Sequence, residues 1–399
     1  MMDCMRVSLC RLCDSGSLDL LYAFTPTPPG DQYQTVAKPQ TCYPLDVMRC
    51  LQCGAVQLAD TVNPALIYPT YLYSTAHSVG LDAHFARYAD SVIERVAPKP
   101  GGYVLDIGSN DGTLLKAFKA RGWEVLGVDP AGTIADDATH AGIPTVEGFL
   151  TTQLASEIAD ASGYAAIITA NHVLANVADL HDTIHAVKTL LAPNGTFVFE
   201  TGYWPRILYC NLIDTIEHEH IHYFAVDPLR RLLARHDLDL VAVEEQPTKG
   251  GSLLGYVRHA GATRLDDSVD TMLAFERSHL TPADYQMWVV NLERLRNQVR
   301  GVVTRKRRTE PWVGYGAAVG STLLLHHFEL GAHLEALWDD NASRHGRVSP
   351  GLHLPVLPPN SSTPDRIVLL AWRYADRIIA AHPEHKGKWI QPLPSLRFA

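Results

Sequence analysis

Apolar and polar positions between residues 103 and 201 follow two alternating patterns. Short apolar runs predict buried strands, at 103–107, 124–128, 165–170 and 196–201, with a shorter one near residue 145. Between them, apolar residues three or four positions apart predict helices, among others at 113–121 and 178–191. Strands that alternate with helices form a parallel sheet covered by helices. The central part of the chain is therefore predicted to be an α/β fold.

The flanking segments carry further elements. A helix is expected at about 81–96, a strand at 253–257 and a helical stretch from 268 to about 308. A second, Rossmann-like α/β unit closes the chain, with strands expected at 312–317, 337–341 and 367–372 and a helix at 321–328. These patterns predict three parts: residues 1–65, 66–265 and 266–399.

The composition narrows the class of protein. The chain has 399 residues, of which 46% are hydrophobic and 19% charged, as expected for a globular protein of two or three domains. Its net charge of −9 argues against a general nucleic-acid binder. The sequence contains neither an apolar run of about 18 residues nor an apolar core near Met1 of the kind that secretory signals carry. We expect a cytoplasmic protein, monomeric or dimeric, that binds no nucleic acid and no membrane.

Four cysteines form two Cys-x-x-Cys pairs in the first 60 residues: Cys10 with Cys13, and Cys50 with Cys53. Each pair can direct two sulfur atoms at one ion, and Gly54 suits the turn after the second pair. Four thiolates complete the tetrahedral ligand set of a structural Zn²⁺ and leave no position for a substrate. The alternative is a set of four unligated thiols in a reducing compartment.

The first predicted strand of the central part ends in a glycine-bearing turn: Asp106, Gly108, Asn110 and Gly112 are its candidate cofactor-binding residues. Asp129 and Pro130 end the second strand, about twenty residues later, where an acid can accept ribose hydroxyls. NAD and S-adenosylmethionine both use this layout. The G-x-G-x-x-G spacing of a dinucleotide site is missing, and Asp-x-Gly-x-Asn-x-Gly resembles motif I of class I methyltransferases. The turn therefore predicts S-adenosylmethionine binding.

Polar residues also follow the fourth predicted strand. Asn171 and His172 stand at its carboxyl end, which faces the cofactor in this fold class. Asn176 follows shortly after and is equally consistent with a helix-capping residue.

A tyrosine-rich segment at 68–78 precedes the central part. Its tyrosines and hydroxyl groups, ahead of the helix expected at about 81–96, make it a candidate lid over the site. A linker whose tyrosines pack against the next core explains the segment equally well.

The stretch from Asp214 to Phe224 alternates histidines and glutamates. On a strand, His218, His220 and His222 would share one face, whereas on a helix His218 and His222 would stack. A histidine oriented by a carboxylate is the best general-base candidate in the chain, because histidine titrates near neutral pH. A second metal site and a solvated polar loop are the alternatives.

Further candidates lie in the last third of the chain. Lys249, Gly250 and Gly251 precede the strand at 253–257, and glycines there permit close approach of the backbone to a substrate. Tyr315 stands in the Gly turn of the second α/β unit, another candidate for substrate binding. The basic run at 305–308 is consistent with an exposed helix end or with steering of an anionic substrate.

Taken in order, these segments resemble the sugar C-methyltransferases that act on nucleotide-linked keto-deoxysugars. The resemblance covers nearly the whole chain and rests on the order of its blocks: the four cysteines, the tyrosine-rich segment, the turn at 106–112, Glu219-His220, Gly250-Gly251, the turn at 314–317 and Ser349-Pro350-Gly351. It implies a zinc-binding N-terminal domain, a Rossmann-like class I methyltransferase domain that binds S-adenosylmethionine, and a C-terminal Rossmann-like domain for substrate.

The resemblance also implies a reaction. A base removes a proton beside a ketone, and the carbon of the resulting enolate attacks the methyl group of the donor. By position the base falls on His220, with Glu219 orienting or assisting it, and a tyrosine, Tyr71 or Tyr73, faces the substrate. His222, Lys249, Gly250, Gly251 and Tyr315 are then expected to contact a nucleotide-linked, dTDP-type sugar.

Three positions depart from the family pattern. Relatives often carry histidine where this chain has Asn176, tyrosine where it has Glu217, and lysine where it has Gly320. Asn176 can donate a hydrogen bond but cannot act as an acid at neutral pH. The alternatives to C-methylation are methyl transfer to O or N of another metabolite, an NAD-dependent oxidoreductase or epimerase, and a zinc-module interaction or nucleic-acid protein with an inactive methyltransferase domain.

Overall fold

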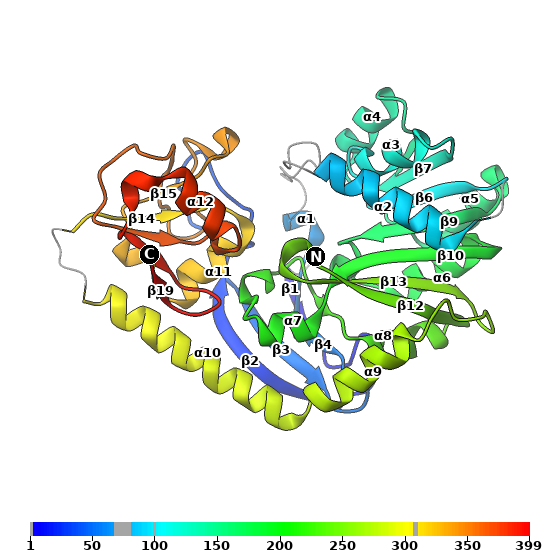
Figure 1. Ribbon diagram of the computed structural model, residues 1–399, viewed down its shortest axis with the longest axis horizontal. Coiled ribbons are helices and arrows are strands. Elements are labelled where there is room, and N and C mark those ends of the chain that lie inside the picture. The colour runs from blue at the N-terminus through cyan, green and yellow to red at the C-terminus, as the bar shows by residue number, and fades with distance from the viewer. Residues whose placement is uncertain (1–2, 68–80, 99–100, 306–309) are drawn as a thin grey trace.

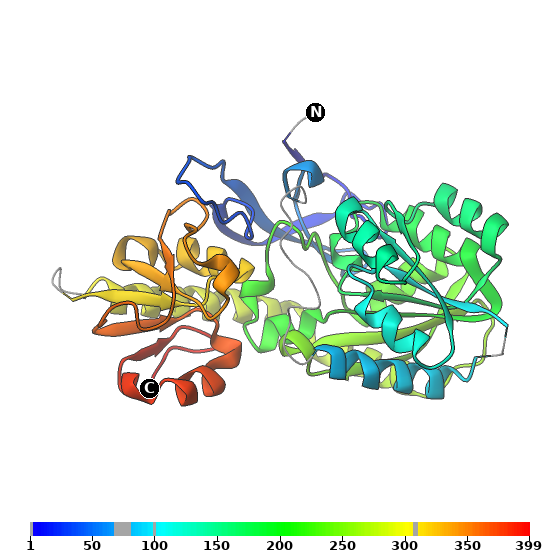
Figure 2. The same ribbon diagram turned by 90° about the horizontal axis from the view of Figure 1, so that it is seen from above.

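A computed structural model describes residues 3–67, 81–98, 101–305 and 310–399. Figure 1 shows two lobes, each built around its own sheet, with N-terminal strands lying between them. The view from above places the N-terminal strands across the gap between the same two lobes (Figure 2). In the part of the chain that the structure describes, no helix combines the length and apolarity of a membrane-spanning segment.

The central lobe holds a seven-stranded sheet in the order β12-β13-β10-β9-β6-β7-β8. Its parallel strands are β6 (Tyr103–Ile107), β7 (Glu124–Asp129), β8 (Thr145–Glu147), β9 (Ala165–Asn171) and β10 (Leu191–Gly202). Next to β10 lie β13 (Ser252–His259), antiparallel to it, and β12 (Leu238–Gln246), antiparallel to β13. The expected parallel sheet is confirmed. It also contains β13, which lies between β10 and the edge strand β12 and is antiparallel to both.

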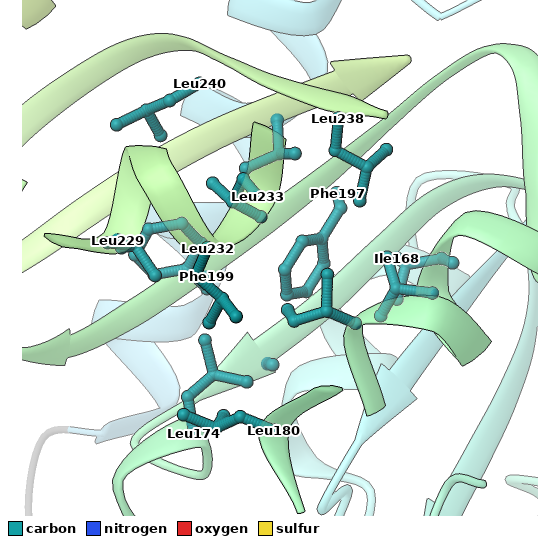
Figure 3. Close-up of a cluster of buried hydrophobic side chains, with 14 of the residues drawn as sticks. Ile168, Leu174, Leu180, Phe197, Phe199, Leu229, Leu232, Leu233, Leu238 and Leu240 are labelled. Carbon is teal, nitrogen blue, oxygen red and sulfur yellow. The ribbon is translucent and has the colours of Figure 1, made fainter. Parts of the chain in front are cut away.

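Alternate residues of the central strands pack against different helices. Val104 and Ile167 contact a cluster formed with α2 (Leu81–Val96) and α3 (Thr113–Lys119). Leu105 and Ile168 join the opposite cluster (Figure 3), to which four helices contribute: α5 (Thr152–Ser162), α6 (Leu180–Leu190), α8 (Val226–Ala234) and α9 (Ser268–His279). Because both faces are buried, these strands read as continuous apolar runs. The lobe also contains α4 (Gly132–His140) and α7 (Trp204–Tyr209).

The N-terminal residues form two small sheets. One pairs β1 (Cys4–Arg6) with β5 (Asp60–Val62), and a short helix α1 (Pro64–Ile67) follows. The other has the order β11-β4-β3-β2, with β2 (Leu18–Thr27), β3 (Tyr43–Cys50) and β4 (Val56–Leu58). Its fourth strand, β11 (His222–Tyr223), comes from the central lobe. The histidine-rich segment is therefore attached to the N-terminal sheet.

The C-terminal lobe holds a six-stranded sheet in the order β16-β15-β14-β17-β18-β19. The strands are β14 (Trp312–Tyr315), β15 (Ala336–Trp338), β16 (Val356–Leu357), β17 (Arg366–Leu369), β18 (Trp389–Gln391) and β19 (Arg397–Phe398). All neighbours are parallel except the last pair. Helices α11 (Val319–His327) and α12 (Ala375–Ala381) belong to this lobe. The second α/β unit is as expected.

The stretch expected to be helical from 268 to about 308 contains two helices in its described part, α9 and α10 (Pro282–Val303). Thr281 caps α10 through a capping box with Asp284, and Pro282 occupies the first helical position, so the signals that start a new helix were present in the sequence. Trp372, expected in a strand, begins a 3₁₀ turn after β17 instead. Along α10, Trp288 and Leu292 share a core with Tyr22 and Phe24 of β2. The boundaries at residues 65 and 265 stay predictions.

Candidate functional site

The turn after β6 has the geometry of a ligand cradle. Gly108 and Gly112 both have left-handed backbone conformations, with φ of 68° and 73°. A Cβ atom on Gly108 would lie 2.5 Å from Cγ2 of Val173, and one on Gly112 would lie 2.9 Å from Cγ2 of Ile143. Both positions therefore require glycine for conformation and for space. Helix α3 begins at Thr113, directly after the turn.

Asp129, at the end of β7, braces this turn. Its Oδ2 accepts a hydrogen bond from the backbone N–H of Asn110 at 2.8 Å, and its Oδ1 accepts one from Ala131 at 2.9 Å. Pro130 lies between Asp129 and Ala131 in the chain. Burial raises the pKa of Asp129 above its usual value. The carboxylate therefore fixes the turn and still has lone pairs available for a ribose hydroxyl.

Asp106 lies beneath the turn and is 4% exposed. Thr169 of β9 donates a hydrogen bond to its Oδ1 at 2.6 Å. Burial raises the pKa of Asp106 to about 7. Asp106 thus joins the ends of β6 and β9 from inside the sheet.

The carboxyl end of β9 meets a buried carboxylate that the sequence analysis missed. Glu200, in β10, is 1% exposed, accepts hydrogen bonds from Thr248 and, at 2.5 Å, from Ser252, and lies 3.5 Å from Nε2 of His172. Its second oxygen lies 3.8 Å from Nε2 of His84. Burial opposes ionisation of Glu200, but these donors outweigh it and lower the pKa. A glutamate inside an otherwise apolar run was the signal available in the sequence.

His172 and Asn171 differ in their surroundings. His172 has a left-handed backbone, φ 57°, and its N–H donates to the carbonyl oxygen of Glu200 at 2.6 Å. Burial and the charge of Lys249 lower the pKa of His172 to about 4. Within the described residues, both polar side-chain atoms of Asn171 are buried and form no hydrogen bond of ordinary geometry, as expected for a group that binds a ligand.

The histidine-rich segment is neither the strand nor the helix considered from its spacing. Residues 213–215 form a 3₁₀ turn, and the backbone N–H of His220 donates to the carbonyl of Glu217 at 3.0 Å, closing a second tight turn. Only His222 and Tyr223 are extended, as β11. Within the described residues, a group of ligand atoms close enough for one metal ion is found at the cysteines and not among these histidines.

His220 is the histidine that remains accessible. Its side chain is 27% exposed, and its Nδ1 lies 2.8 Å from the carbonyl oxygen of Thr215. A carbonyl only accepts, so Nδ1 carries the proton and Nε2 keeps a lone pair for a substrate proton. Burial lowers the pKa of His220 below its usual value. The neutral form, which a general base requires, is therefore favoured near neutral pH.

Two glutamates accompany His220, and Glu217 is the closer. Oε1 of Glu217 lies 3.3 Å from Nδ1 of His220. Glu219, the residue expected to orient His220, is 8% exposed and forms no hydrogen bond or ion pair with any described residue. Burial, followed by the neighbouring Glu217, raises the pKa of Glu219 to about 8, and burial also raises that of Glu217 to about 8.

The two remaining histidines of the segment anchor it. Nε2 of His218 lies 3.2 Å from the carbonyl oxygen of Tyr43, and Nε2 of His222 lies 2.9 Å from that of Val177. Both are almost fully buried, at 3% and 1% exposed. His222, expected to contact substrate, is thus occupied in attaching β11 to the central lobe. Tyr315, the other distant candidate, is buried in the C-terminal core and donates to Asp340 at 2.9 Å.

The turn at Lys249, Gly250 and Gly251 approaches the same site from β12 and β13. Lys249 is exposed, and Arg373 of the C-terminal lobe donates to its carbonyl oxygen at 3.1 Å. Arg373 also pairs with Asp214 at 2.6 Å. The structure therefore brings the turn together with the segment that carries His220.

Asn176 ends a 3₁₀ turn at Leu174–Asn176, and its buried Oδ1 accepts no hydrogen bond from the described residues. Asp179, and not Asn176, caps α6 by accepting a hydrogen bond from Asp182. The neighbouring Ala175 carbonyl accepts from Ile221, which ties this turn to the histidine-rich segment. Tyr71 and Tyr73 lie outside the described residues.

The four cysteines converge as predicted; we call Cys10, Cys13, Cys50 and Cys53 the Cys4 cluster. Their sulfur atoms all lie within 4.8 Å of one another, and the pairs Cys10–Cys53 and Cys13–Cys50 are 3.6 Å apart. Tetrahedral coordination at a Zn–S distance of about 2.3 Å places sulfurs roughly 3.8 Å apart, so the cluster fits the ion. Gly54 has φ 80° and donates to the carbonyl of Cys50, which confirms its expected place in the turn.

Comparisons with known proteins match every part of the chain. Three family models match: "Putative zinc binding domain" over residues 10–68, "Methyltransferase domain" over 81–243, and "C-methyltransferase C-terminal domain" over 247–394. The C-methyltransferase NovU of Streptomyces niveus is 32% identical over all of this chain and 98% of its own length. A ubiquinone biosynthesis O-methyltransferase of Azorhizobium caulinodans is 31% identical over 30% of this chain and 46% of its own.

Two solved structures are each similar to less than half of the chain. Magnesium protoporphyrin IX methyltransferase from Synechocystis, with bound S-adenosylhomocysteine, covers 45% of this chain and 84% of its own at 15% identity and a TM-score of 0.36. The CcbJ methyltransferase from Streptomyces caelestis covers 47% of this chain and 95% of its own, with the same identity and TM-score. From its full-length relative and its three matched domains, the chain belongs to the C-methyltransferase family and is an S-adenosylmethionine-dependent methyltransferase.

Proposed function

We propose that this enzyme methylates a carbon next to a ketone on a nucleotide-linked deoxysugar, with dTDP as the nucleotide. The relative NovU is a C-methyltransferase, and transfer to carbon needs a base that activates the carbon. The observation that carries the proposal is His220: its protonated Nδ1 faces the carbonyl of Thr215, so its Nε2 has a free lone pair.

The donor fits the turn after β6. Gly108 and Gly112 allow the left-handed, closely packed turn that precedes the start of α3, and Asn171 offers buried polar atoms that form no hydrogen bond among the described residues at the neighbouring strand end. We assign Asp106, Asn110, Asp129 and His172 to the same donor site, of which Asp129 would accept the ribose hydroxyls. When bound, S-adenosylmethionine supplies an electrophilic methyl group.

The acceptor is activated in one proton transfer. Nε2 of His220 takes the proton from the carbon beside the ketone, and the electron pair of that C–H bond moves onto the ketone oxygen. The carbon of this enolate would then bond to the methyl group as the sulfur–methyl bond of the donor breaks, and the electron pair of that bond would stay on the sulfur of S-adenosylhomocysteine. Glu219 assists the base, Asn176 donates a hydrogen bond to substrate, and Tyr71 and Tyr73 stay candidates for the opposite side. Gly250 and Gly251 allow the sugar to approach the backbone.

We further propose that the Cys4 cluster holds a structural Zn²⁺. The supporting observations are four converging sulfur atoms and the family model that matches residues 10–68. Four thiolates complete the tetrahedral coordination of the ion, so the metal would stabilise the turns of the two Cys-x-x-Cys pairs and take no part in methyl transfer. Such thiols suit a reducing compartment, and we propose a cytoplasmic location.

The test is deuterium exchange into dTDP-4-keto-6-deoxyglucose with S-adenosylhomocysteine in place of the donor. The wild-type protein should exchange the hydrogen next to the ketone, and His220→Asn should slow exchange roughly 10²- to 10⁴-fold. His185→Asn, at an exposed histidine of α6, is the matched control and should exchange at the wild-type rate. Near-normal exchange in His220→Asn would remove the base assignment. Methylation without any exchange would favour transfer to O or N.

A further inference from the structure

We propose that the ammonium group of Lys249 binds the substrate oxygen that becomes negatively charged when His220 removes the neighbouring proton. The inference rests on the proposed function, which it deepens by assigning a residue to the enolate oxygen. The bond that breaks is C–H, the proton goes to Nε2 of His220, and the electron pair spreads onto the oxygen that Lys249 faces. The pair would return to carbon to form the carbon–methyl bond while the sulfur–methyl bond of the donor breaks and its own pair stays on sulfur, so no oxidant or reductant is needed.

The backbone at Lys249 is unusual for a lysine. It has φ 51° and ψ 25°, in the left-handed region that residues with a side chain seldom adopt. Gly250 and Gly251 follow with φ of 91° and 137°. A strained residue of this kind persists only where its surroundings impose it, and such positions cluster at functional sites.

The surroundings do impose it. On one side, Thr248 donates to buried Glu200 and lies 2.6 Å from the hydroxyl of Ser252. On the other, Arg373 holds the carbonyl of Lys249 from the C-terminal lobe. A Cβ atom on Gly251 would lie 2.7 Å from Cγ of Arg206, so α7 packs closely against the turn. The lysine is therefore presented by a rigid turn fixed to two lobes.

The ammonium group itself has no ionic partner. Among the described residues, no carboxylate oxygen lies within 4.0 Å of Nζ, although the group is surrounded by acids. Its electrostatic neighbours are Glu217, Glu200, Arg373 and Glu219, and Asp214 and Asp31 also act on Glu217. An unpaired, solvent-accessible cation within such a cluster is available to an oxyanion.

The position favours the reacting oxygen over a distant phosphate. The charge of Lys249 lowers the pKa of His172, at the cofactor edge of β9, and also that of His220, the proposed base. The geometry agrees: Thr248 donates to Glu200, which lies 3.5 Å from His172, and Arg373 joins the carbonyl of Lys249 to Asp214 in the segment of His220. The turn that carries Lys249 therefore lies between the donor edge of β9 and the base. Positive charge fixed next to a developing enolate is worth more in the transition state than in the ground state.

The experiment compares Lys249→Met and Lys249→Arg with Lys386→Met, a control at an exposed lysine of the C-terminal lobe. The first measurement needs no substrate: histidine ring signals are titrated by NMR, with His172→Gln and His220→Asn for assignment. Lys249→Met should raise the pKa of both His172 and His220, because a nearby positive charge is lost. Lys386→Met should leave both unchanged. An unchanged pKa in Lys249→Met overturns the placement.

The second measurement is deuterium exchange into dTDP-4-keto-6-deoxyglucose with S-adenosylhomocysteine present. Lys249→Met should lower kcat for exchange roughly 10²- to 10³-fold with KM within about threefold of wild type, as for loss of one oxyanion donor. Lys249→Arg should recover part of it. A raised KM with unchanged kcat overturns the assignment in favour of phosphate binding. If the wild-type protein exchanges nothing, the proposed function fails and this inference with it. If wild type and Lys249→Met exchange equally, only the inference fails.

Discussion

Replacing Asp129 by asparagine tests whether the end of β7 does more than hold its own turn. The two carboxylate oxygens of Asp129 each accept a backbone N–H, from Asn110 at 2.8 Å and from Ala131 at 2.9 Å. Asparagine has one oxygen, so one of these two N–H groups must face the side-chain NH₂. The variant keeps the shape of the side chain and removes one acceptor.

The loss can be estimated from the structure. A backbone N–H bonded to a buried carboxylate contributes about 2 kcal/mol, because its loss leaves a desolvated donor without a partner. Domains of 150 to 250 residues lose about 2–4 °C in Tm for each kcal/mol. Asp129→Asn should therefore lower the Tm of the central lobe by about 4–8 °C. If the carboxylate also accepts ribose hydroxyls, the affinity for S-adenosylhomocysteine should fall roughly 10- to 100-fold.

The C-terminal lobe offers a matched control. Asp339 follows β15 as Asp129 ends β7, and it accepts from Ala317 at 2.6 Å and from Asn341 at 2.8 Å. Asp339→Asn removes the same kind of acceptor from an equivalent turn. It should cost a similar amount of stability and leave S-adenosylhomocysteine binding, measured by calorimetry, at the wild-type value.

Two results would refute the reasoning. If both variants weakened S-adenosylhomocysteine equally, the effect would be general loosening of the fold and no property of the cofactor turn. If Asp129→Asn bound the ligand as tightly as wild type, Asp129 would be a brace alone, and the ribose would need another acceptor.

Three further predictions concern the same turn and the metal module. Gly108→Ala should abolish S-adenosylhomocysteine binding, since its Cβ would lie 2.5 Å from Val173. The control Gly122→Ala, at a residue with φ 85° and open space around it, should cost only about 1 kcal/mol in urea unfolding. Equal effects of the two variants on binding would contradict the role of the turn after β6 as a ligand cradle. Burial raises the pKa of Asp106 to about 7, so the contribution of its protonated form to the free energy of unfolding is complete below about pH 4 and is lost as pH rises through about 7. Asp106→Asn keeps an acceptor for Thr169, and between pH 5 and 8 its free energy of unfolding should fall by about 3 kcal/mol less than that of wild type. Parallel curves of unfolding free energy against pH would disprove this. Elemental analysis should find one zinc ion per Cys4 cluster, and chelation should lower the Tm of the N-terminal module; an unchanged melting curve would count against a structural metal.

Features with a local cause were predictable from the sequence. The Cys4 cluster and the turn at Gly108 and Gly112 depend on residues a few positions apart, whose geometry follows from thiolate coordination and from left-handed glycines. The parallel strands were found because both faces are buried and the apolar runs are continuous. The antiparallel strand β12 carries Glu244 and Glu245 near its exposed end and was not recognised.

The contacts within the site depend on distant parts of the chain. Glu217 lies three residues from His220, but only the tight turn that His220 closes onto the Glu217 carbonyl brings the two side chains to 3.3 Å. The resemblance to the sugar C-methyltransferases had pointed to Glu219 as the partner. Glu200 likewise reads as one acid in an apolar strand until His84 of α2 and Thr248 are placed beside it. Tertiary packing, which no local pattern encodes, decides both.

The histidine-rich segment is attached both to the N-terminal sheet and to the C-terminal lobe. His218 bonds to Tyr43 of the N-terminal sheet, and β11 pairs with β4 of that sheet. Asp214 pairs with Arg373 of the C-terminal lobe, and a Cβ atom on Gly320 of α11 would lie 2.3 Å from the carbonyl oxygen of Asp214. His220 stands between these anchors and has no regular secondary structure of its own. Its orientation is therefore fixed only when the N-terminal module and the C-terminal lobe are both in place, so loosening the Cys4 cluster should disturb the base even though the cluster takes no part in the chemistry.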